Sequence, residues 1–235
     1  MYALVDCNNF YGSCESAFAP HLKNKPLVVL SNNDGCIISR SKEAKALGIP
    51  MGAPFYEWKA FCKNHAVTIF SSNYELYGDM SQRVMSILKE YCSQLEIYSI
   101  DEAFLLLDDS PTLLTELMQL RNAIFMQTGI PTSIGVGATK TLAKLANQIA
   151  KDRQENVFYL DTNTQTALLQ TIPVEKIWGI GQRLAAHLQK LNLRTAYQLL
   201  CADSKLLRLQ FNVTLEKTVQ ELQGISCLQL EIPKD

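Results

Sequence analysis

Apolar residues recur along the chain with the two periods that distinguish strands from helices. Short apolar runs predict strands at residues 2–7, in the two halves of 96–107, and at 132–137. Helical spacing predicts helices at about residues 10–18, 73–92, 110–128 and 140–151. The long helix near residue 73 begins with a capping-box pattern, Ser72-Asn73-Tyr74-Glu75. The expected order is strand, helix, insert, helix, strand, strand, helix, strand, helix, so the sequence predicts an α+β fold.

The insert, residues 21–77, differs in character from the segments on either side. Proline, glycine and the turn Asn32-Asn33-Asp34-Gly35 interrupt it repeatedly. Within it we expect two short strands, 27–30 and 36–38, and a short helix at 41–47. This pattern indicates a small subdomain inserted into a larger one.

Residues 160–235 are leucine-rich and mostly helical, with one interruption at Trp178-Gly179-Ile180-Gly181. This stretch has the form of a helix-hairpin-helix, in which glycines let backbone N–H groups approach a DNA phosphate without a Cβ in the way. A Gly-x-Gly turn between helices is also common without any ligand. The pattern by itself leaves both interpretations open.

Composition excludes several classes of protein. No apolar run approaches the roughly 18 residues needed to span a membrane, and the N-terminus has no basic segment before its short apolar stretch, as a signal peptide would. The seven cysteines include no Cys-x-x-Cys pair, which argues against a zinc site and a disulfide framework. These features fit a protein of the reducing cytoplasm.

The net charge of −1 conceals an uneven distribution. Residues 1–20 and 78–136 together carry 3 Lys and Arg against 10 Asp and Glu. Residues 21–77 carry 7 against 4, and residues 137–235 carry 12 against 9, so each of these two regions has a net charge of +3. An acidic segment between two basic ones is typical of a metal site flanked by parts that grip nucleic acid, and also of ordinary solvated faces.

Three carboxylates stand out against this background. Asp6 ends an apolar strand, and Asp101-Glu102 lies in an apolar hairpin about a hundred residues later. Carboxylates among apolar residues are costly to bury unless a cation compensates their charge, and Mg²⁺ prefers a few carboxylates together with water and phosphate oxygens. The pattern is consistent with two-metal phosphoryl transfer. A strand-end Asp with an exposed acidic turn is the alternative that spacing alone does not exclude.

The wider sequence resembles the Y-family DNA polymerases, and within them the branch of UmuC, the catalytic subunit of bacterial DNA polymerase V. The resemblance rests on motifs that occur in order along nearly the whole chain. They are Asp6-Cys7-Asn8-Asn9-Phe10-Tyr11-Gly12-Ser13-Cys14-Glu15, Ser31-Asn32-Asn33-Asp34-Gly35-Cys36, Ser72-Asn73-Tyr74-Glu75-Leu76-Tyr77, Tyr98-Ser99-Ile100-Asp101-Glu102-Ala103-Phe104, Thr139-Lys140-Thr141-Leu142-Ala143-Lys144-Leu145-Ala146-Asn147 and Trp178-Gly179-Ile180-Gly181.

The resemblance implies a ferredoxin-like palm at residues 1–20 and 78–165, small fingers inserted at 21–77, and a helical thumb with a helix-hairpin-helix at 166–235. Family members continue into a little-finger domain, which we expect to be absent from this chain. Two Mg²⁺ ions are implied as cofactors. Their ligands by position are Asp6, Asp101 and Glu102, which are the catalytic residues, with the backbone carbonyl of Cys7.

The resemblance also implies a nucleotide site. Tyr11 falls at the steric-gate position, where its ring would exclude a 2′-hydroxyl, and Phe10 lies beside it. Ser39, Arg40, Lys45 and Lys151 are the residues expected to bind the triphosphate. Lys42 is equally well explained as part of a solvated helix face.

DNA contacts are expected from Lys140 and Lys144 and from Gly179, Ile180 and Gly181. The stretch Gly137-Ala138-Thr139-Lys140-Thr141 is not a phosphate loop, because such a loop needs Gly directly before its Lys.

The function that the resemblance implies is error-prone translesion synthesis, in which a primer is extended with dNTPs during the SOS response to DNA damage. The expected partners are primer–template DNA and a dNTP, together with processed UmuD, RecA and the sliding clamp, and no membrane. A catalytically weak DNA-binding or accessory form that needs a further C-terminal domain is the alternative. A nucleotide cyclase shares palm-like two-metal carboxylates, but it has no need of inserted fingers or a helix-hairpin-helix.

Overall fold

A computed structural model describes residues 1–231 and has the mixed α+β architecture that the sequence predicts. Within these residues eight strands form two sheets, one of five strands and one of three. The larger sheet has the order β5-β6-β1-β7-β8, with β1 Tyr2–Cys7, β5 Leu95–Ile97, β6 Glu102–Leu106, β7 Thr132–Gly137 and β8 Val157–Tyr159. The central strand β1 is antiparallel to both of its neighbours, β6 and β7. Two distant parts of the sequence therefore flank the N-terminal strand.

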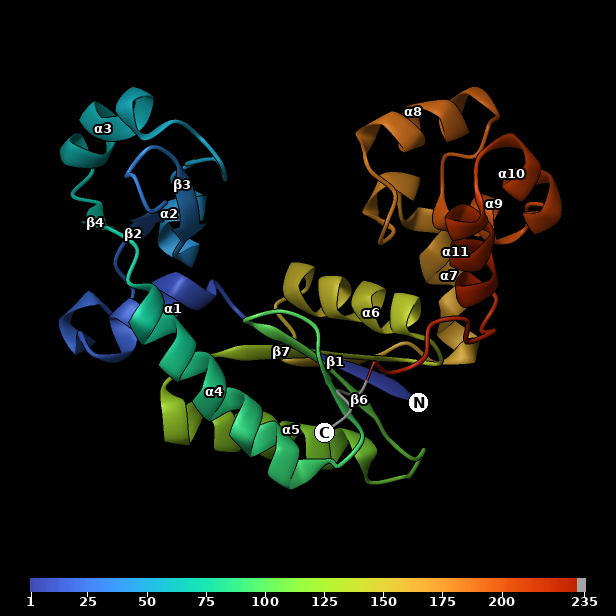
Figure 1. Ribbon diagram of the computed structural model, residues 1–235, viewed down its shortest axis with the longest axis horizontal. Coiled ribbons are helices and arrows are strands. Elements are labelled where there is room, and N and C mark those ends of the chain that lie inside the picture. Colours follow the sequence, from blue (N-terminus) through green and yellow to red (C-terminus); the bar gives the residue numbers. More distant parts are fainter. Residues whose placement is uncertain (232–235) are drawn as a thin grey trace.

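Helices cover both faces of the larger sheet (Figure 1). They are α4 Tyr74–Tyr91 and α5 Leu113–Thr128 on one face and α6 Lys140–Asp152 on the other, with α1 Phe10–Ala17 following β1. The alternation of a strand sends Ala3 and Val5 into the core under α4 and α5. Leu4 packs on the opposite face with Ala143 of α6. Asp6 lies two residues after Leu4 on the same strand, so its side chain also faces α6.

The predicted insert forms its own small lobe. Its sheet has the order β3-β2-β4, with β2 Leu27–Leu30, β3 Ile37–Arg40 and β4 Thr68–Phe70. Its helices are η1 Pro20–Leu22, α2 Lys42–Ala46 and α3 Phe55–Asn64. Val28, Ile37, Ile49 and Cys62 are buried in a core that belongs to this lobe alone. The expected elements β2, β3 and α2 are confirmed, whereas α3 and β4 were not predicted.

The C-terminal part is helical, as predicted. Its elements are α7 Thr162–Thr171, η2 Val174–Lys176, α8 Gln182–Lys190, α9 Ala196–Leu200, α10 Ser204–Gln210 and α11 Val213–Leu222. They pack around a second core that Leu142 and Leu145 of α6 share. The small lobe and the C-terminal helices stand at opposite ends of α6, on the same side of the larger sheet (Figure 1). Residues 232–235 of the predicted thumb lie outside the described residues.

Three further expectations can be compared with the structure. All seven cysteines lie within the described residues and have free thiols. Over residues 1–231, none of the helices is long and apolar enough to span a membrane. The capping box was misplaced, because the long helix α4 begins at Tyr74 and its N-cap is Asn73, whose Oδ1 accepts from the backbone N–H of Leu76 at 3.1 Å. Ser72 lies outside the helix, and its hydroxyl is not the cap.

A buried ion pair ties the segment at residues 229–231 to the larger sheet. Lys140 at the start of α6 forms a salt bridge with Glu96 of β5, and both side chains are less than 10% exposed. The Lys140 ammonium also donates to the Gln229 carbonyl at 2.7 Å, and Glu96 accepts from the Glu231 N–H at 2.7 Å. Since this ammonium is used inside the protein, the predicted contact of Lys140 with DNA is wrong.

Replacing Lys140 with methionine is expected to lower the free energy of unfolding by about 3 kcal/mol, because Glu96 would be left as an uncompensated buried charge. Urea unfolding followed by circular dichroism measures the change. The double variant Lys140→Met/Glu96→Met should recover most of the loss, and Lys89→Met, at an exposed position of α4, should cost almost nothing. Equal stability of the Lys140 and Lys89 variants would contradict this account.

Candidate functional site

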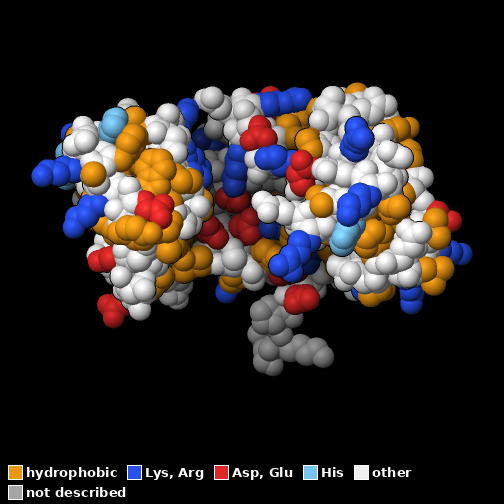
Figure 2. Space-filling view, turned by 90° about the horizontal axis from the view of Figure 1, so that it is seen from above, with side chains coloured by type: hydrophobic (Ala, Val, Ile, Leu, Met, Phe, Trp, Pro, Cys, Tyr) orange, Lys and Arg blue, Asp and Glu red, His pale blue; other side chains and the backbone are white. Residues whose placement is uncertain are grey.

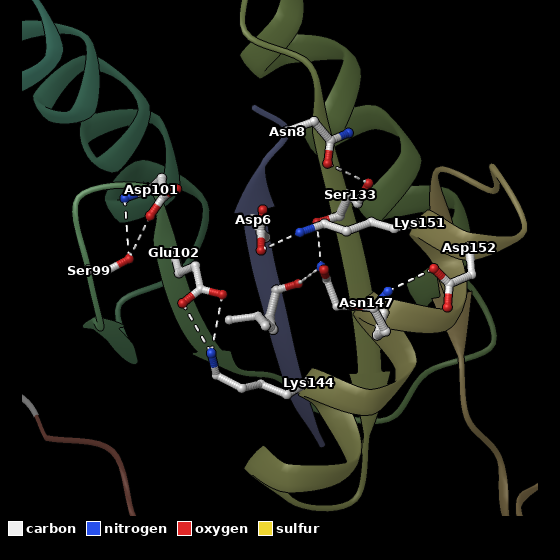
Figure 3. Close-up of polar contacts among 12 residues, drawn as sticks. Asp6, Asn8, Ser99, Asp101, Glu102, Ser133, Lys144, Asn147, Lys151 and Asp152 are labelled. Atoms are coloured by element: carbon white, nitrogen blue, oxygen red, sulfur yellow. Dashed lines mark hydrogen bonds and ion pairs between the residues drawn. The ribbon is translucent and has the colours of Figure 1, made fainter. Parts of the chain in front are cut away.

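Two of the three predicted carboxylates are brought together by strand pairing. Asp6 of β1 and Glu102 of β6 are directly opposed partners in the antiparallel ladder. On one face of such a pair, opposed Cβ atoms lie about 5 Å apart. Both side chains point toward α6 (Figure 3). Asp6 and Glu102 are almost a hundred residues apart in the sequence, yet they are neighbours across the two strands.

Asp101 lies immediately before β6, and its backbone is tied to the same corner. Its carbonyl accepts from the Cys7 N–H at 2.9 Å, so β1 and β6 remain paired past Asp6. Its carboxylate accepts from the Ser99 hydroxyl at 2.8 Å. The expected position of the acidic pair, at or near the turn between two strands, is confirmed, because β5 ends at Ile97 and β6 begins at Glu102.

Two lysines of α6 form ion pairs with two of the three carboxylates. Lys151 Nζ lies 2.5 Å from Asp6 Oδ2, and Lys144 Nζ lies 3.0 Å from Glu102 Oε2. Together these four residues line a cleft of about 180 Å³, which Asn147 and Trp178 also border. Viewed from above, acidic side chains lie at the bottom of the hollow between the two lobes, with basic ones on its walls (Figure 2). The uneven charge distribution along the chain therefore places acidic residues inside this hollow and basic residues around it.

Burial dominates the electrostatics of Asp6. It raises the pKa of this carboxyl to about 7, although the Lys151 ammonium opposes the shift, and the neighbouring Glu102 adds to it. A carboxylate in this position gains strongly from any additional cation. The site therefore has three carboxylates and two paired lysines, so the protein itself compensates its negative charge only in part.

The donor set fits a hard divalent cation such as Mg²⁺, which prefers carboxylate oxygens. Nowhere in residues 1–231 are three His, Cys, Asp or Glu side chains grouped closely enough to hold a metal. The reason lies in the contacts above: Asp6 and Glu102 are turned toward lysines, and Asp101 toward Ser99. The Cys7 side chain is buried in the core on the other face, so only its backbone carbonyl is a possible ligand.

Three polar residues that the sequence analysis did not single out hold this corner in place. Asn147 of α6 donates to the carbonyls of Leu4 and Ser133 at 3.3 and 2.8 Å. The Ser133 hydroxyl donates to Asn8 Oδ1 at 3.0 Å (Figure 3). Ser99, the partner of Asp101, is the third. The sequence could have indicated Asn147, because it shares one helix face with Lys144 and Lys151, which were both predicted to bind ligands.

Tyr11 is the predicted sugar gate, and its ring has a rigid support. It stacks on Tyr77 with centroids 4.4 Å apart and an interplanar angle of 21°. Tyr77 is fully buried, and its hydroxyl donates to Glu15 at 2.7 Å. The side chain of Phe10, in contrast, is only 3% exposed and belongs to the core. Its backbone is the part left for a nucleotide contact, and that contact stays a prediction.

The predicted triphosphate residues of the small lobe have different surroundings. Ser39 is buried, and its hydroxyl accepts from the Gly12 N–H at 3.2 Å, so it joins β3 to α1 and is not available to a ligand. Arg40 donates to the Ile49 carbonyl. For Lys45 of α2, partial desolvation lowers the pKa, the charges of Arg40 and Lys151 lower it further, and Asp6 raises it. Lys45 therefore lies within electrostatic reach of both Asp6 and Lys151.

The loop at residues 179–181 has the open backbone that the sequence predicts. Gly179 has a φ of +83°, which favours glycine, and an added Cβ at Gly179 or Gly181 would meet no atom within 4 Å. Gly181 is the N-cap of α8, while Ile180 is buried among the C-terminal helices. The loop thus presents backbone, not side chains, at its surface. Its contact with DNA and its identification as a helix-hairpin-helix stay predictions.

Comparison with known proteins gives the site a context. The impB/mucB/samB family profile matches residues 5–148. The chain is 46% identical to the protein UmuC of Salmonella typhimurium over 238 residues, which cover 98% of this chain and 56% of UmuC. It is 40% identical to MucB of Escherichia coli, again over 98% of this chain and 56% of the relative. It is 33% identical to a DNA polymerase IV of Moorella thermoacetica over 94% of this chain and 56% of that protein.

Solved structures show that the fold is shared. A ternary complex of Dbh superposes with a TM-score of 0.83 at 22% identity, covering 95% of this chain and 67% of that one. DinB from Sulfolobus solfataricus gives a TM-score of 0.80 at 23% identity, covering 94% and 66%. The chain spans about half the length of the curated relatives that it matches.

Proposed function

Because the chain belongs to the impB/mucB/samB family of Y-family DNA polymerases, we propose that it is the catalytic core of an error-prone translesion DNA polymerase. The observation that carries the proposal is the cross-strand pair Asp6–Glu102 with Asp101 beside it, at the base of a cleft lined by lysines. The reaction is template-directed: a primer 3′-hydroxyl attacks the α-phosphate of a dNTP in line, and pyrophosphate leaves.

The parts of the molecule take the roles that this reaction needs. Residues 1–20 and 78–165, with the larger sheet, form a ferredoxin-like palm that carries the carboxylates. Residues 21–77 form the fingers, and residues 166–235 the thumb with its helix-hairpin-helix. The separate core of the small lobe and the position of both lobes on one side of the sheet support this division.

Asp6, Asp101, Glu102 and the Cys7 carbonyl would hold two Mg²⁺ ions. When bound, these ions supply the positive charge that activates the attacking hydroxyl and stabilises the leaving pyrophosphate. The protein side chains do the remaining work. Lys45 from the fingers and Lys151 from α6 bind triphosphate oxygens as point charges, since a lysine ammonium has no bidentate fork.

DNA is held from the thumb side. The backbone N–H groups of Gly179 and Gly181 bind a phosphate independently of base sequence, which suits an enzyme that must accept any template. That of Ile180 is already used, because it donates to the Ile177 carbonyl at 3.0 Å. Two of the similar structures are described as ternary complexes, which supports DNA and a nucleotide as substrates. Processed UmuD, RecA and the sliding clamp, and a role in the SOS response within the cytoplasm, follow from the family resemblance.

Extension of a labelled primer annealed to a template tests the proposed function. With Mg²⁺ and dNTPs at low salt the chain is expected to add nucleotides, and chelation of Mg²⁺ with EDTA should stop the addition. A protein that neither extends the primer nor binds DNA or dNTP contradicts the proposal.

Replacing Tyr11 with alanine is expected to lower the preference for dNTPs over NTPs by about a hundredfold, the discrimination that an apolar wall achieves against one extra hydroxyl. Single-nucleotide incorporation with a dNTP and the matching NTP measures the ratio. Tyr11→Phe keeps the ring and should keep the preference, and Tyr56→Ala, at a 78% exposed position of the small lobe, should not change it. An unchanged ratio of dNTP to NTP incorporation in the Tyr11→Ala variant would show that Tyr11 does not exclude the 2′-hydroxyl.

A further inference from the structure

Lys144 has a second set of contacts besides its ion pair with Glu102. Its ammonium lies 4.4 Å from the ring centroid of Tyr98, 5.1 Å from that of Trp178 and 6.0 Å from that of Phe104. The three rings contact one another edge-on or tilted, with centroids 5.6 to 6.0 Å apart. We call these three residues the aromatic pocket. A cation over such faces is attracted by the negative charge of the π-systems.

The aromatic pocket joins three separate parts of the chain. Tyr98 comes from the connection between β5 and β6, and Phe104 from β6 itself. Trp178 belongs to the C-terminal helical region and directly precedes Gly179 of the exposed loop. Lys144 therefore stands between a candidate metal ligand and the segment that leads to the candidate DNA-binding loop.

The two attractions on Lys144 differ in how they respond to a divalent cation. A cation bound at the carboxylates competes directly for Glu102, and it repels the ammonium that Glu102 releases. The attraction to the rings does not depend on Glu102. The side chains of Lys144 and Glu102 are 16% and 20% exposed, so their ion pair is partly shielded from water. Replacement of Lys144 by a divalent cation at Glu102 should therefore change the affinity for that cation measurably.

We propose that Lys144 occupies the carboxylate site as its cation in the absence of a metal ion; this inference rests on the proposed metal-dependent function. Lys144 pairs with Glu102 until a divalent ion takes that carboxylate, and the aromatic pocket then keeps its ammonium in place. Two consequences follow. Lys144 lowers the affinity of the site for the divalent ion, and occupation of the site changes the charge beside the Trp178 ring.

The chain offers a direct probe, because Trp58 and Trp178 are its two tryptophans. Trp58 packs in the core of the small lobe. In a Trp58→Phe background, Trp178 is the remaining source of tryptophan fluorescence. Titration with Mg²⁺ alone is expected to change this emission, and titration calorimetry gives the dissociation constant independently.

Adding Lys144→Met to this background is expected to tighten Mg²⁺ binding about fivefold, the change that loss of one competing ion pair of ordinary strength produces. The emission change should largely disappear. Lys144→Arg keeps the charge and should bind Mg²⁺ like the parent. Damage to the fold would weaken metal binding, so tighter binding in the methionine variant separates the proposed role from a structural one.

The outcomes distinguish this inference from the proposed function. Mg²⁺ binding that Lys144→Met leaves unchanged or weakens, in a parent that binds Mg²⁺, would overturn the role of Lys144 alone. A parent protein that binds no more Mg²⁺ than Asp101→Ala would overturn both.

Discussion

Replacing Asp101 with alanine is expected to lower the rate of nucleotide incorporation by about a thousandfold, as for loss of one preorganised group that stabilises charge in a transition state. The carboxylate lies at the end of the connection before β6 and accepts a hydrogen bond only from Ser99 among the contacts of the described residues. Its backbone carbonyl, which pairs with Cys7, is unaffected by the change. Activity should therefore be lost while the fold is kept.

The measurement is single-turnover incorporation of one dNTP with excess enzyme, so that weak DNA binding does not limit the rate. Asp108→Ala is the matched control, because it removes the same charge from an exposed position seven residues later. The control should keep nearly full activity, and both variants should unfold at the same urea concentration as the parent. Equal rates for the two variants would show that Asp101 is not part of the catalytic site.

Replacing Gly135 with alanine is expected to lower the free energy of unfolding by about 4 kcal/mol or more, an effect at the upper end for single substitutions. In β7, a Cβ at this position would lie 2.0 Å from the backbone N of Asn147 and 2.4 Å from the Ala143 carbonyl oxygen. Both atoms belong to the backbone of α6, so relief requires the whole helix to move off the sheet.

This displacement would also move the side chains of the site, since Lys144 and Lys151 lie on the same helix. Gly78→Ala is the matched control: it lies in α4, an added Cβ there meets nothing within 4 Å, and alanine should stabilise the helix by about 1 kcal/mol. Urea unfolding of both variants measures the difference. A Gly135→Ala protein as stable as the parent would mean that α6 does not pack this closely on β7.

The elements that the sequence predicted well carry strong local signals. Helix α6 has a long, regular apolar pattern and strand β7 a short apolar run, and the bounds of both agree with the prediction to within a residue. Strand β8 was missed because it has three half-buried residues at the edge of the sheet, too few to show a period. Helix α3 was missed because it lies in a segment dominated by proline and glycine, although Pro54 forms its N-cap.

The site was predictable in its residue types and less so in its contacts. Parity along β1 fixes the face of Asp6, but its register against Glu102 is set by long-range pairing that no local pattern reveals. The expectations for the side chains of Ser39 and Lys140 failed for one reason. Each side chain is held by a distant part of the chain, α1 and the C-terminal segment respectively, which no local pattern reveals.

Template dependence of nucleotide addition tests the central claim most directly. Four primer–templates that differ only in the first unpaired template base are each incubated with one labelled dNTP at a time, in Mg²⁺ and at low salt. The account predicts that the added nucleotide follows the template base, with complementary pairs clearly favoured, and that the Asp101→Ala protein adds none. Addition that ignores the template base, or no addition by a protein that binds both DNA and dNTP, would contradict it.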